Sequence, residues 1–166
     1  TAAPKKDSVI PSKNQYEYQK QELAAFCHFG MNTYTGSEWG NGKENPNQFQ
    51  LTNDFDEETY VKAIHDAGFK KLIITAKHHD GFCIWPSEMT THDTETAGYE
   101  GDVLEELSRA CTKYNIDMGL YLSPWDVNSE YYGYKDKDGK KLVGADGQPL
   151  NGKTWDQVKQ EDALDY

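Results

Sequence analysis

The chain has 166 residues, with 17 Lys and Arg against 28 Asp and Glu, so its net charge at pH 7 is −11. This charge repels phosphate backbones and anionic lipid surfaces, and no apolar run is long enough to span a bilayer. Neither nucleic acid binding nor membrane insertion is therefore expected. Aromatic residues make up 13% of an otherwise polar sequence, and flat rings with one polar tip suit sites that are partly apolar and partly wet.

Three cysteines, Cys27, Cys83 and Cys111, lack the C-x-x-C spacing of a zinc or redox motif. Cys27 and Cys111 fall at apolar positions of a predicted strand and a predicted helix, where buried free thiols are expected. The first residue is Thr1 rather than Met, which indicates either a removed leader or a trimmed sequence.

The first predicted unit follows a polar, Lys-rich segment. Residues 1–22 are expected to form an irregular lead-in, with a short helix at about residues 16–20. Residues 23–29 predict a short buried strand that ends at Gly30, followed by a long loop. Asp56 is placed to cap a helix with one apolar face, and Gly68 is suited to end it.

Two further units repeat this order. Residues 71–76 predict a second buried strand and residues 116–122 a third, while Asp102 and Glu105 have capping-box spacing at the start of a helix that ends at Asn115. Evenly spaced strands with a helix before each new strand are typical of a parallel sheet with its helices on one side. The fold class is therefore α/β. The strand-to-helix loops are long, and in a (β/α)₈ barrel these loops carry the active site.

Beyond residue 131 the pattern loosens. Two Asp-Gly pairs flank residues 140–143 and predict a small hairpin. Thr154 or Asp156 is expected to cap a helix that runs to the end. No linker separates this part, so residues 23–166 are expected to form one unit.

Polar side chains stand at the end of each predicted strand. His28 follows the first, His78 and His79 follow the second, and Tyr121 ends the third. Because parallel strands end at the same edge of a sheet, these side chains are expected to meet at one rim. Imidazole donors and acceptors can divide among sugar hydroxyls.

The loops near this rim add two pairs of residues that combine an indole with a carboxylate. Glu38 and Trp39 lie in the first long loop, and Trp125 and Asp126 follow the third strand, as possible site residues. Pro124 forces the residue before it into an extended conformation, which directs Trp125 over the rim. Each pair can also be structural, with the indole folded onto the core.

A metal site is the competing interpretation. Adjacent strand residues point to opposite faces, so the pair His78-His79 is a poor chelate, and no His-x-His spacing is present. We therefore expect no metal or cofactor, although an unrelated metal-dependent barrel hydrolase stays open as an alternative.

Taken in order, four motifs resemble the opening of the family-29 glycoside hydrolases, the α-L-fucosidases. They are HFG at residues 28–30, EW at 38–39, KHHDGF at 77–82, and SPWD at 123–126 after Tyr121. KHHDGF is the most specific of them, and SPWD is more similar to the branch that acts on α-1,3/1,4-linked fucose. The resemblance implies the N-terminal portion of a (β/α)₈ TIM-like barrel, about three βα units, with the remainder of the barrel needed for a stable fold.

The resemblance also implies a function, that of a retaining, exo-acting α-L-fucosidase that removes terminal fucose from a fucosylated oligosaccharide or glycoconjugate. It implies that His28, Glu38, His78, His79 and Tyr121 bind the fucose ring substituents and that Trp39 lines the same pocket. The nucleophile and the acid/base are expected beyond Tyr166, because the family's Trp-x-Asp-Gly motif does not occur in this sequence. The family pattern gives neither Asp80 nor Asp126 a catalytic role.

Two consequences remain expectations. A substrate of this kind, together with the non-Met start, indicates a periplasmic or extracellular location. A non-catalytic sugar-binding protein, which keeps the pocket and lacks the catalytic residues, is the second alternative.

Overall fold

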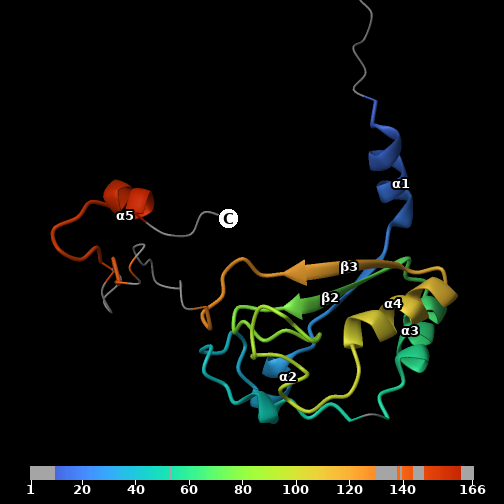
Figure 1. Ribbon diagram of the computed structural model, residues 1–166. Helices are drawn as coiled ribbons and strands as arrows, with labels where there is room; N and C mark the ends of the chain where they lie inside the picture. Colours follow the sequence, from blue (N-terminus) through green and yellow to red (C-terminus); the bar gives the residue numbers. More distant parts are fainter. Residues whose placement is uncertain (1–9, 53, 130–137, 139, 144–147, 162–166) are drawn as a thin grey trace, which may run out of the picture.

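The computed structural model describes residues 10–52, 54–129, 138, 140–143 and 148–161 (Figure 1). Its sheet has three parallel strands in the order β1 (Ala24–Cys27), β2 (Lys71–Lys77) and β3 (Asp117–Leu122). Ala24 pairs with Lys71, and Lys71 pairs with Asp117, so the three strands start level. The parallel α/β arrangement expected from the sequence is confirmed.

The first strand differs from its prediction. It spans four residues rather than 23–29, and it is not buried, since Phe26 is 48% exposed and Leu23 is 53% exposed. The middle strand β2, in contrast, buries Leu72 and Ile74 almost completely. Phe26 pairs with Ile73 on the face of the sheet away from the helices, and no described element packs over that face.

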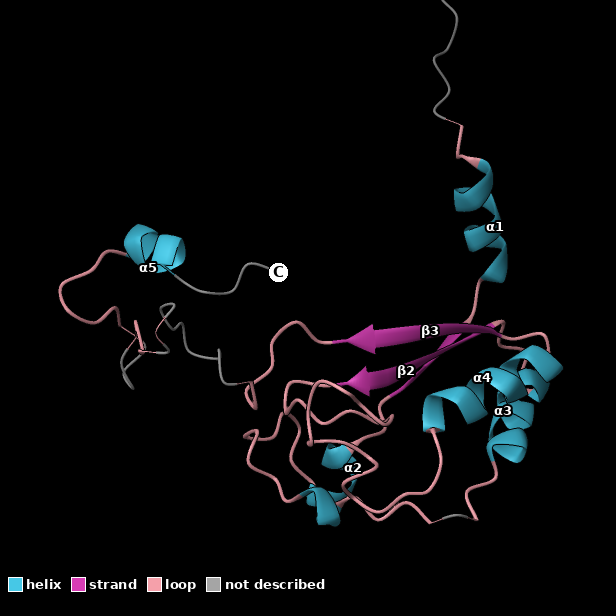
Figure 2. Cartoon of the chain, viewed as in Figure 1, coloured by secondary structure: helices cyan, strands magenta, loops and turns pink. Residues whose placement is uncertain are grey.

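Two helices, α3 (Glu57–Asp66) and α4 (Val103–Lys113), pack against each other below one face of the sheet (Figures 1 and 2). Both begin where predicted. The carboxylate of Asp56 accepts a hydrogen bond from the Thr59 amide at 2.8 Å. The carboxylate of Asp102 accepts from two amides at 2.9 and 3.0 Å.

The capping box predicted for α4 is incomplete. Glu105 does not bond back to the amide of Asp102, because its carboxylate pairs with Arg109 one turn along the helix, at 2.8 Å. The exposed helix surface thus offers Glu105 an i,i+4 partner in place of the cap.

The hydrophobic core lies between these helices and the covered face of the sheet. Its buried members on the helices are Val61, Val103, Leu107, Ala110 and Cys111, and they meet Leu72 and Ile74 of β2. All three cysteines are free, and Cys83 and Cys111 are buried as thiols. Cys27 is only partly buried, because β1 lies at the edge of the sheet.

The short helix expected within the lead-in is present and is longer than predicted. Residues Lys13–Gln21 form helix α1, which begins with a complete capping box between Ser12 and Gln15. The first long loop also contains short helices, α2 (Met31–Thr35) and η1 (Pro46–Gln48). None of the described helices has the length and apolar character needed to cross a membrane.

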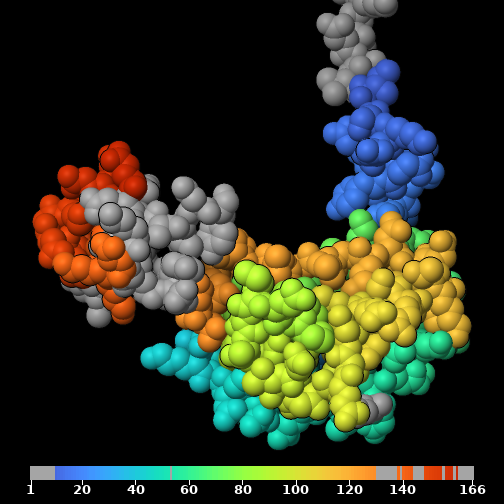
Figure 3. Space-filling model, in the orientation of Figure 1, coloured from blue at the N-terminus to red at the C-terminus, as the bar shows by residue number. Residues whose placement is uncertain are grey.

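The C-terminal part of the chain is described only in segments. In the described part of the predicted hairpin, Val143 forms an antiparallel bridge with Pro149 and the Leu150 amide donates to the Leu142 carbonyl at 2.8 Å. Residues 130–137, 139 and 144–147 lie outside the described residues. Helix α5 (Trp155–Glu161) is capped by Thr154 rather than Asp156, since the Gln157 amide donates to the Thr154 hydroxyl at 3.3 Å. This helix stands apart from the sheet and from α3 and α4 (Figure 3).

Candidate functional site

The carboxyl ends of the three strands meet at one edge of the sheet. His28 follows β1, His78 follows β2, and Tyr121 lies near the end of β3. The ring centroids of His28 and His78 are 5.2 Å apart, and the ring of Tyr121 stacks on His78 at 5.7 Å. The ring of His79 lies 4.2 Å from that of His78. The structure therefore brings the four residues predicted at the strand ends to one rim.

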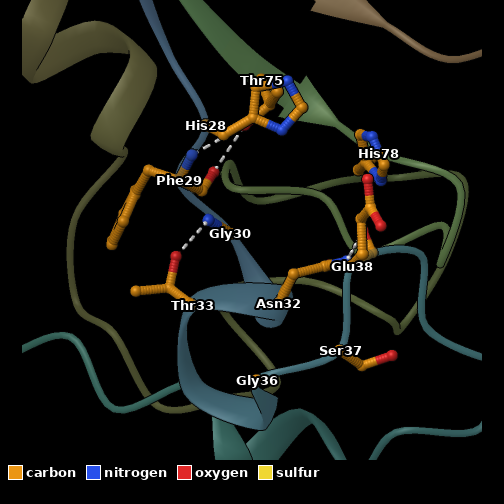
Figure 4. Close-up of a pocket in the computed structure, with 10 residues that line it drawn as sticks. All are labelled: His28, Phe29, Gly30, Asn32, Thr33, Gly36, Ser37, Glu38, Thr75 and His78. Carbon is orange, nitrogen blue, oxygen red and sulfur yellow. Dashed lines mark hydrogen bonds between the residues drawn. The ribbon is translucent and has the colours of Figure 1, made fainter.

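A cavity of about 380 Å³ opens at this rim (Figure 4). It lies between the ends of β1 and β2 on one side and α2 with the following loop on the other. The lining residues are His28, Phe29, Gly30, Asn32, Thr33, Gly36, Ser37, Glu38, Thr75 and His78. Three of the predicted site residues, His28, Glu38 and His78, line it, and the others lie beside it.

The end of β1 is held from two sides. The buried hydroxyl of Thr75 donates to the Phe29 carbonyl at 2.8 Å, and its oxygen accepts from the Phe29 amide at 3.0 Å (Figure 4). The Phe29 ring packs against Phe49 and Phe55 with centroids 5.7 and 6.5 Å away. With Phe29 fixed in this way, His28 is held on the opposite side of the chain, toward the cavity.

The surroundings of His78 favour its neutral form. Burial lowers the pKa of His78 below its usual value, and the neighbouring His79 and His28 lower it further, while the nearby Glu38 carboxylate opposes the shift. Figure 4 shows Glu38 next to the His78 ring. The Nδ1 atom of His78 is buried with no hydrogen-bond partner among the described residues. A neutral imidazole offers one donor and one acceptor to a ligand.

A second group of rings lies next to the cavity. Trp39 and Trp125 meet edge to face with centroids 5.4 Å apart, and the ring of His79 lies 5.7 Å from Trp39 and 4.8 Å from Trp125. Trp39 remains 53% exposed and Trp125 41% exposed. Trp39 thus belongs to this ring group, outside the lining of the cavity, and its exposed face is available to a ligand.

Asp126, near the rim, holds the loop that follows β3 in place. Asp126 forms an ion pair with Lys77 at 2.9 Å, and its other oxygen accepts from the amides of Asn128 and Ser129 at 2.9 and 3.0 Å. This geometry favours a structural role for Asp126, which the sequence had marked as a possible site residue.

The described residues contain no group of His, Cys, Asp or Glu side chains arranged to hold a metal ion.

Asp80 is the more deeply buried acid, at 1% exposure, and one of its oxygens accepts from the Phe82 amide at 2.7 Å. Its other oxygen has no partner among the described residues. Burial raises the pKa of Asp80 to about 6, and the negative charge of Glu44 contributes in the same direction.

The loops at the rim contact each other at two glycines, where there is no space for a side chain. A Cβ on Gly42 would stand 2.6 Å from the backbone of Val127 and Asn128, and the Asn128 amide group donates to the Gly42 carbonyl at 2.8 Å. A Cβ on Gly81 would meet the Asp126 carboxylate. The backbone at both glycines has a positive φ, which side chains rarely adopt.

Comparison with known proteins decides the family. The alpha-L-fucosidase family model matches residues 2–160, nearly the whole chain. The chain belongs to the alpha-L-fucosidase family. The resemblance seen in the four sequence motifs is thereby confirmed, while the assignment to the α-1,3/1,4 branch is not.

Relatives of this family share the sequence and the fold. Alpha-L-fucosidase 1 of Arabidopsis thaliana is 46% identical over 127 residues, which cover 75% of this chain and 25% of that protein. A glycoside hydrolase family 29 fucosidase of Ruminococcus gnavus, solved in complex with fucose, is 54% identical with a TM-score of 0.75, over 95% of this chain and 32% of that one. The tissue alpha-L-fucosidase of Macaca fascicularis is 29% identical, over 80% of this chain and 34% of that protein. The chain thus spans about a quarter to a third of the length of these fucosidases.

Four polar residues of the cavity were missed from the sequence: Asn32, Thr33, Ser37 and Thr75. Asn32 and Thr33 lie on α2, a helix too short to show a periodic pattern. For Thr75 a signal existed, because it is the one polar residue within the apolar run 72–76. A buried hydroxyl in such a strand needs a hydrogen-bond partner, which points to a special contact.

Proposed function

We propose that the chain forms the fucose-binding part of a retaining, exo-acting α-L-fucosidase, as the N-terminal portion of its (β/α)₈ barrel. The observation that carries this proposal is the cavity at the strand ends, in a chain that belongs to the alpha-L-fucosidase family. Three parallel strands in sequential order, with long loops on the side of the cavity, are consistent with about three βα units of such a barrel.

The size and lining of the cavity suit one sugar ring. Small-molecule pockets commonly occupy about 300–1,000 Å³, and this one lies near the lower end. In this proposal His28, His78 and Glu38 bind ring hydroxyls from inside the cavity. His79 reaches the sugar from the adjacent ring group, and Tyr121 from its position against His78. Glu38 supplies an acceptor for two hydroxyls, and the neutral His78 supplies both a donor and an acceptor.

The bond-breaking groups belong to the remainder of the barrel in this proposal. A retaining mechanism needs two carboxyl groups about 5–5.5 Å apart, one of which attacks the anomeric carbon. Asp126 is engaged by Lys77 and the following backbone, and Asp80 is buried below the loops. Neither is free to act as the nucleophile, so both carboxyl groups are assigned to positions beyond Tyr166.

The finer assignments follow from the sequence. The SPWD motif at residues 123–126 supports α-1,3/1,4-linked fucose in a fucosylated oligosaccharide or glycoconjugate as the substrate. A substrate of this type supports a periplasmic or extracellular location. We propose no metal or cofactor, since hydrolysis by a carboxyl pair requires none.

The test uses the full-length protein to which the chain belongs, titrated with fucose and with galactose and assayed with an aryl α-L-fucoside. We expect binding of fucose in preference to galactose, together with turnover. Binding without turnover would identify a non-catalytic sugar-binding protein. Equal binding of both sugars, or binding of neither, would refute the fucose pocket.

A further inference from the structure

The ring of His79 is held by a short chain of hydrogen bonds that ends on the backbone. Its Nδ1 atom lies 2.7 Å from the Ser123 hydroxyl oxygen, and that hydroxyl donates to the Trp125 carbonyl at 2.8 Å. Ser123 is 1% exposed, and its own amide donates to the Lys77 carbonyl at 2.9 Å. Pro124 also restricts the backbone of Ser123. The hydroxyl is therefore fixed in place.

The protons in this chain can be placed from the chemistry of the atoms. Two oxygens 2.8 Å apart need a proton between them, and a carbonyl has none, so the proton comes from Ser123. A hydroxyl has only one proton. The contact of 2.7 Å between Ser123 and His79 must then take its proton from the imidazole, at Nδ1.

We propose that Ser123 is a positioning residue which holds neutral His79 in its Nδ1-protonated tautomer and so leaves Nε2 as a hydrogen-bond acceptor. In a neutral imidazole only one nitrogen carries a proton. Nε2 of His79 has no hydrogen bond within the described part of the chain, and it is not among the buried unpartnered atoms there. It is therefore open to a ligand.

This arrangement determines which ligand group His79 can accept. An acceptor nitrogen requires a hydroxyl that donates, and it disfavours a fluorine or a carbonyl oxygen at the same place. Because His79 lies between His78 and Trp125, at the rim beside the cavity, the hydroxyl belongs to a sugar bound there. This second step rests on the proposed function, whereas the tautomer does not.

The first experiment tests the tautomer without any sugar. The full-length protein is labelled with ¹⁵N-histidine, and the ring nitrogens are observed by NMR at about pH 8.5, where an ordinary imidazole is neutral. His79→Gln identifies the signals of His79. We expect a protonated Nδ1 and an unprotonated Nε2 in the wild type and in Ser123→Thr, which keeps the hydroxyl. A protonated Nε2 in the wild type would overturn the proposal.

Ser123→Ala removes the acceptor, so the proton is expected to move to Nε2 or to divide between the two nitrogens. The control Ser87→Ala removes a loop hydroxyl that accepts from the Met89 amide, and it should leave the His79 signals unchanged. An unchanged tautomer in folded Ser123→Ala would also refute the positioning role. If Ser123→Ala does not fold, the spectra of the wild type and Ser123→Thr still decide which nitrogen of His79 carries the proton.

The second experiment tests the contact with the sugar. Fucose and its monofluorinated analogues, with fluorine in place of one hydroxyl at a time, are titrated into the same proteins. We expect one position at which fluorine weakens binding to the wild type about tenfold, a penalty that shrinks in Ser123→Ala, where Nε2 can donate. The same penalty in both proteins, at every position, would refute the contact. Absence of any fucose binding would instead refute the proposed function, with the NMR result unaffected.

Discussion

Replacing Asp80 by Asn should remove a pH-dependent loss of stability. The carboxyl of Asp80 has a pKa of about 6 in the folded protein, against 3.8 for an unperturbed Asp, because it is buried and lies near Glu44. One pKa unit corresponds to about 1.36 kcal/mol, so ionised Asp80 costs the folded state about 3 kcal/mol above pH 6. The Asn side chain keeps the oxygen that accepts from the Phe82 amide, so the substitution changes the charge with little change in packing.

The sign follows from proton binding. Below about pH 4 the group is protonated in both states and contributes nothing. Between pH 4 and 6 the unfolded chain releases its proton while the folded chain keeps it, so wild-type stability falls as the pH rises. Asp80→Asn should therefore gain stability relative to wild type across this range, by about 2–3 kcal/mol at pH 7.

The assay is denaturant unfolding of the full-length wild type and variant at several pH values between 4 and 7.5. The matched control is Asp56→Asn, at an exposed helix cap whose pKa is lowered chiefly by hydrogen bonds from Thr59. Because the pKa of Asp56 lies below 3.8 in the folded protein, the carboxyl is ionised in both states above pH 4, and the difference between Asp56→Asn and wild type should stay nearly constant over this range. A constant difference between Asp80→Asn and wild type over the whole range would refute the reasoning.

Further changes test the site and the fold. His28→Ala should lower kcat/KM of the full-length protein by a factor that corresponds to a loss of roughly 1–3 kcal/mol of transition-state binding. The control His65→Ala, on the exposed surface of α3, should leave kcat/KM unchanged. Equal effects of the two substitutions would indicate a structural role for His28. Lys77→Met leaves the Asp126 carboxylate partly buried without its cation and should cost about 1–3 kcal/mol in denaturant unfolding, while Lys62→Met, at an exposed pair, should have no measurable effect. Residues 1–166 expressed alone should show no cooperative melt, because apolar side chains such as Leu122, at 60% exposure, lie uncovered. They should not hydrolyse an aryl α-L-fucoside, because the carboxyl pair of the proposed mechanism lies outside them. A sharp cooperative melt of the monomeric chain would contradict the expectation about folding. Turnover that persists after contaminating full-length enzyme is removed would contradict the expectation about hydrolysis.

The regular elements could be predicted because each has a local cause. The helix caps at Asp56 and Asp102 and the apolar run of β2 are visible in the sequence, and each places an element within a few residues of its true bounds. The rim could be predicted for a geometric reason, since parallel strands end at the same edge. His28, His78 and Tyr121 therefore meet without any knowledge of the loops.

The wall of the cavity could not be predicted, because it is built by a short helix and a loop that show no periodic pattern in the sequence. Helix α2 forms in a segment rich in Gly and Asn, with its first residue Met31 buried at 1% exposure and its next residue, Asn32, bonded to the Glu38 carbonyl at 2.5 Å. That bond holds the backbone of Glu38, whose side chain lines the cavity, whereas Trp39 is not among the lining residues. The sequence pairs the two residues but gives no sign of which one faces the ligand.

The close approach of the rim loops at Gly42 and Gly81 has a consequence for engineering substrate preference. The first loop lies with its backbone against residues 127 and 128, and the second lies against Asp126, so neither has an independent shape. A loop taken from another member of the alpha-L-fucosidase family would contact a neighbouring loop whose backbone does not match it. Experiments that aim to change substrate preference should therefore exchange the three loop segments 36–44, 80–83 and 123–129 together, so that the contacts among these loops are kept.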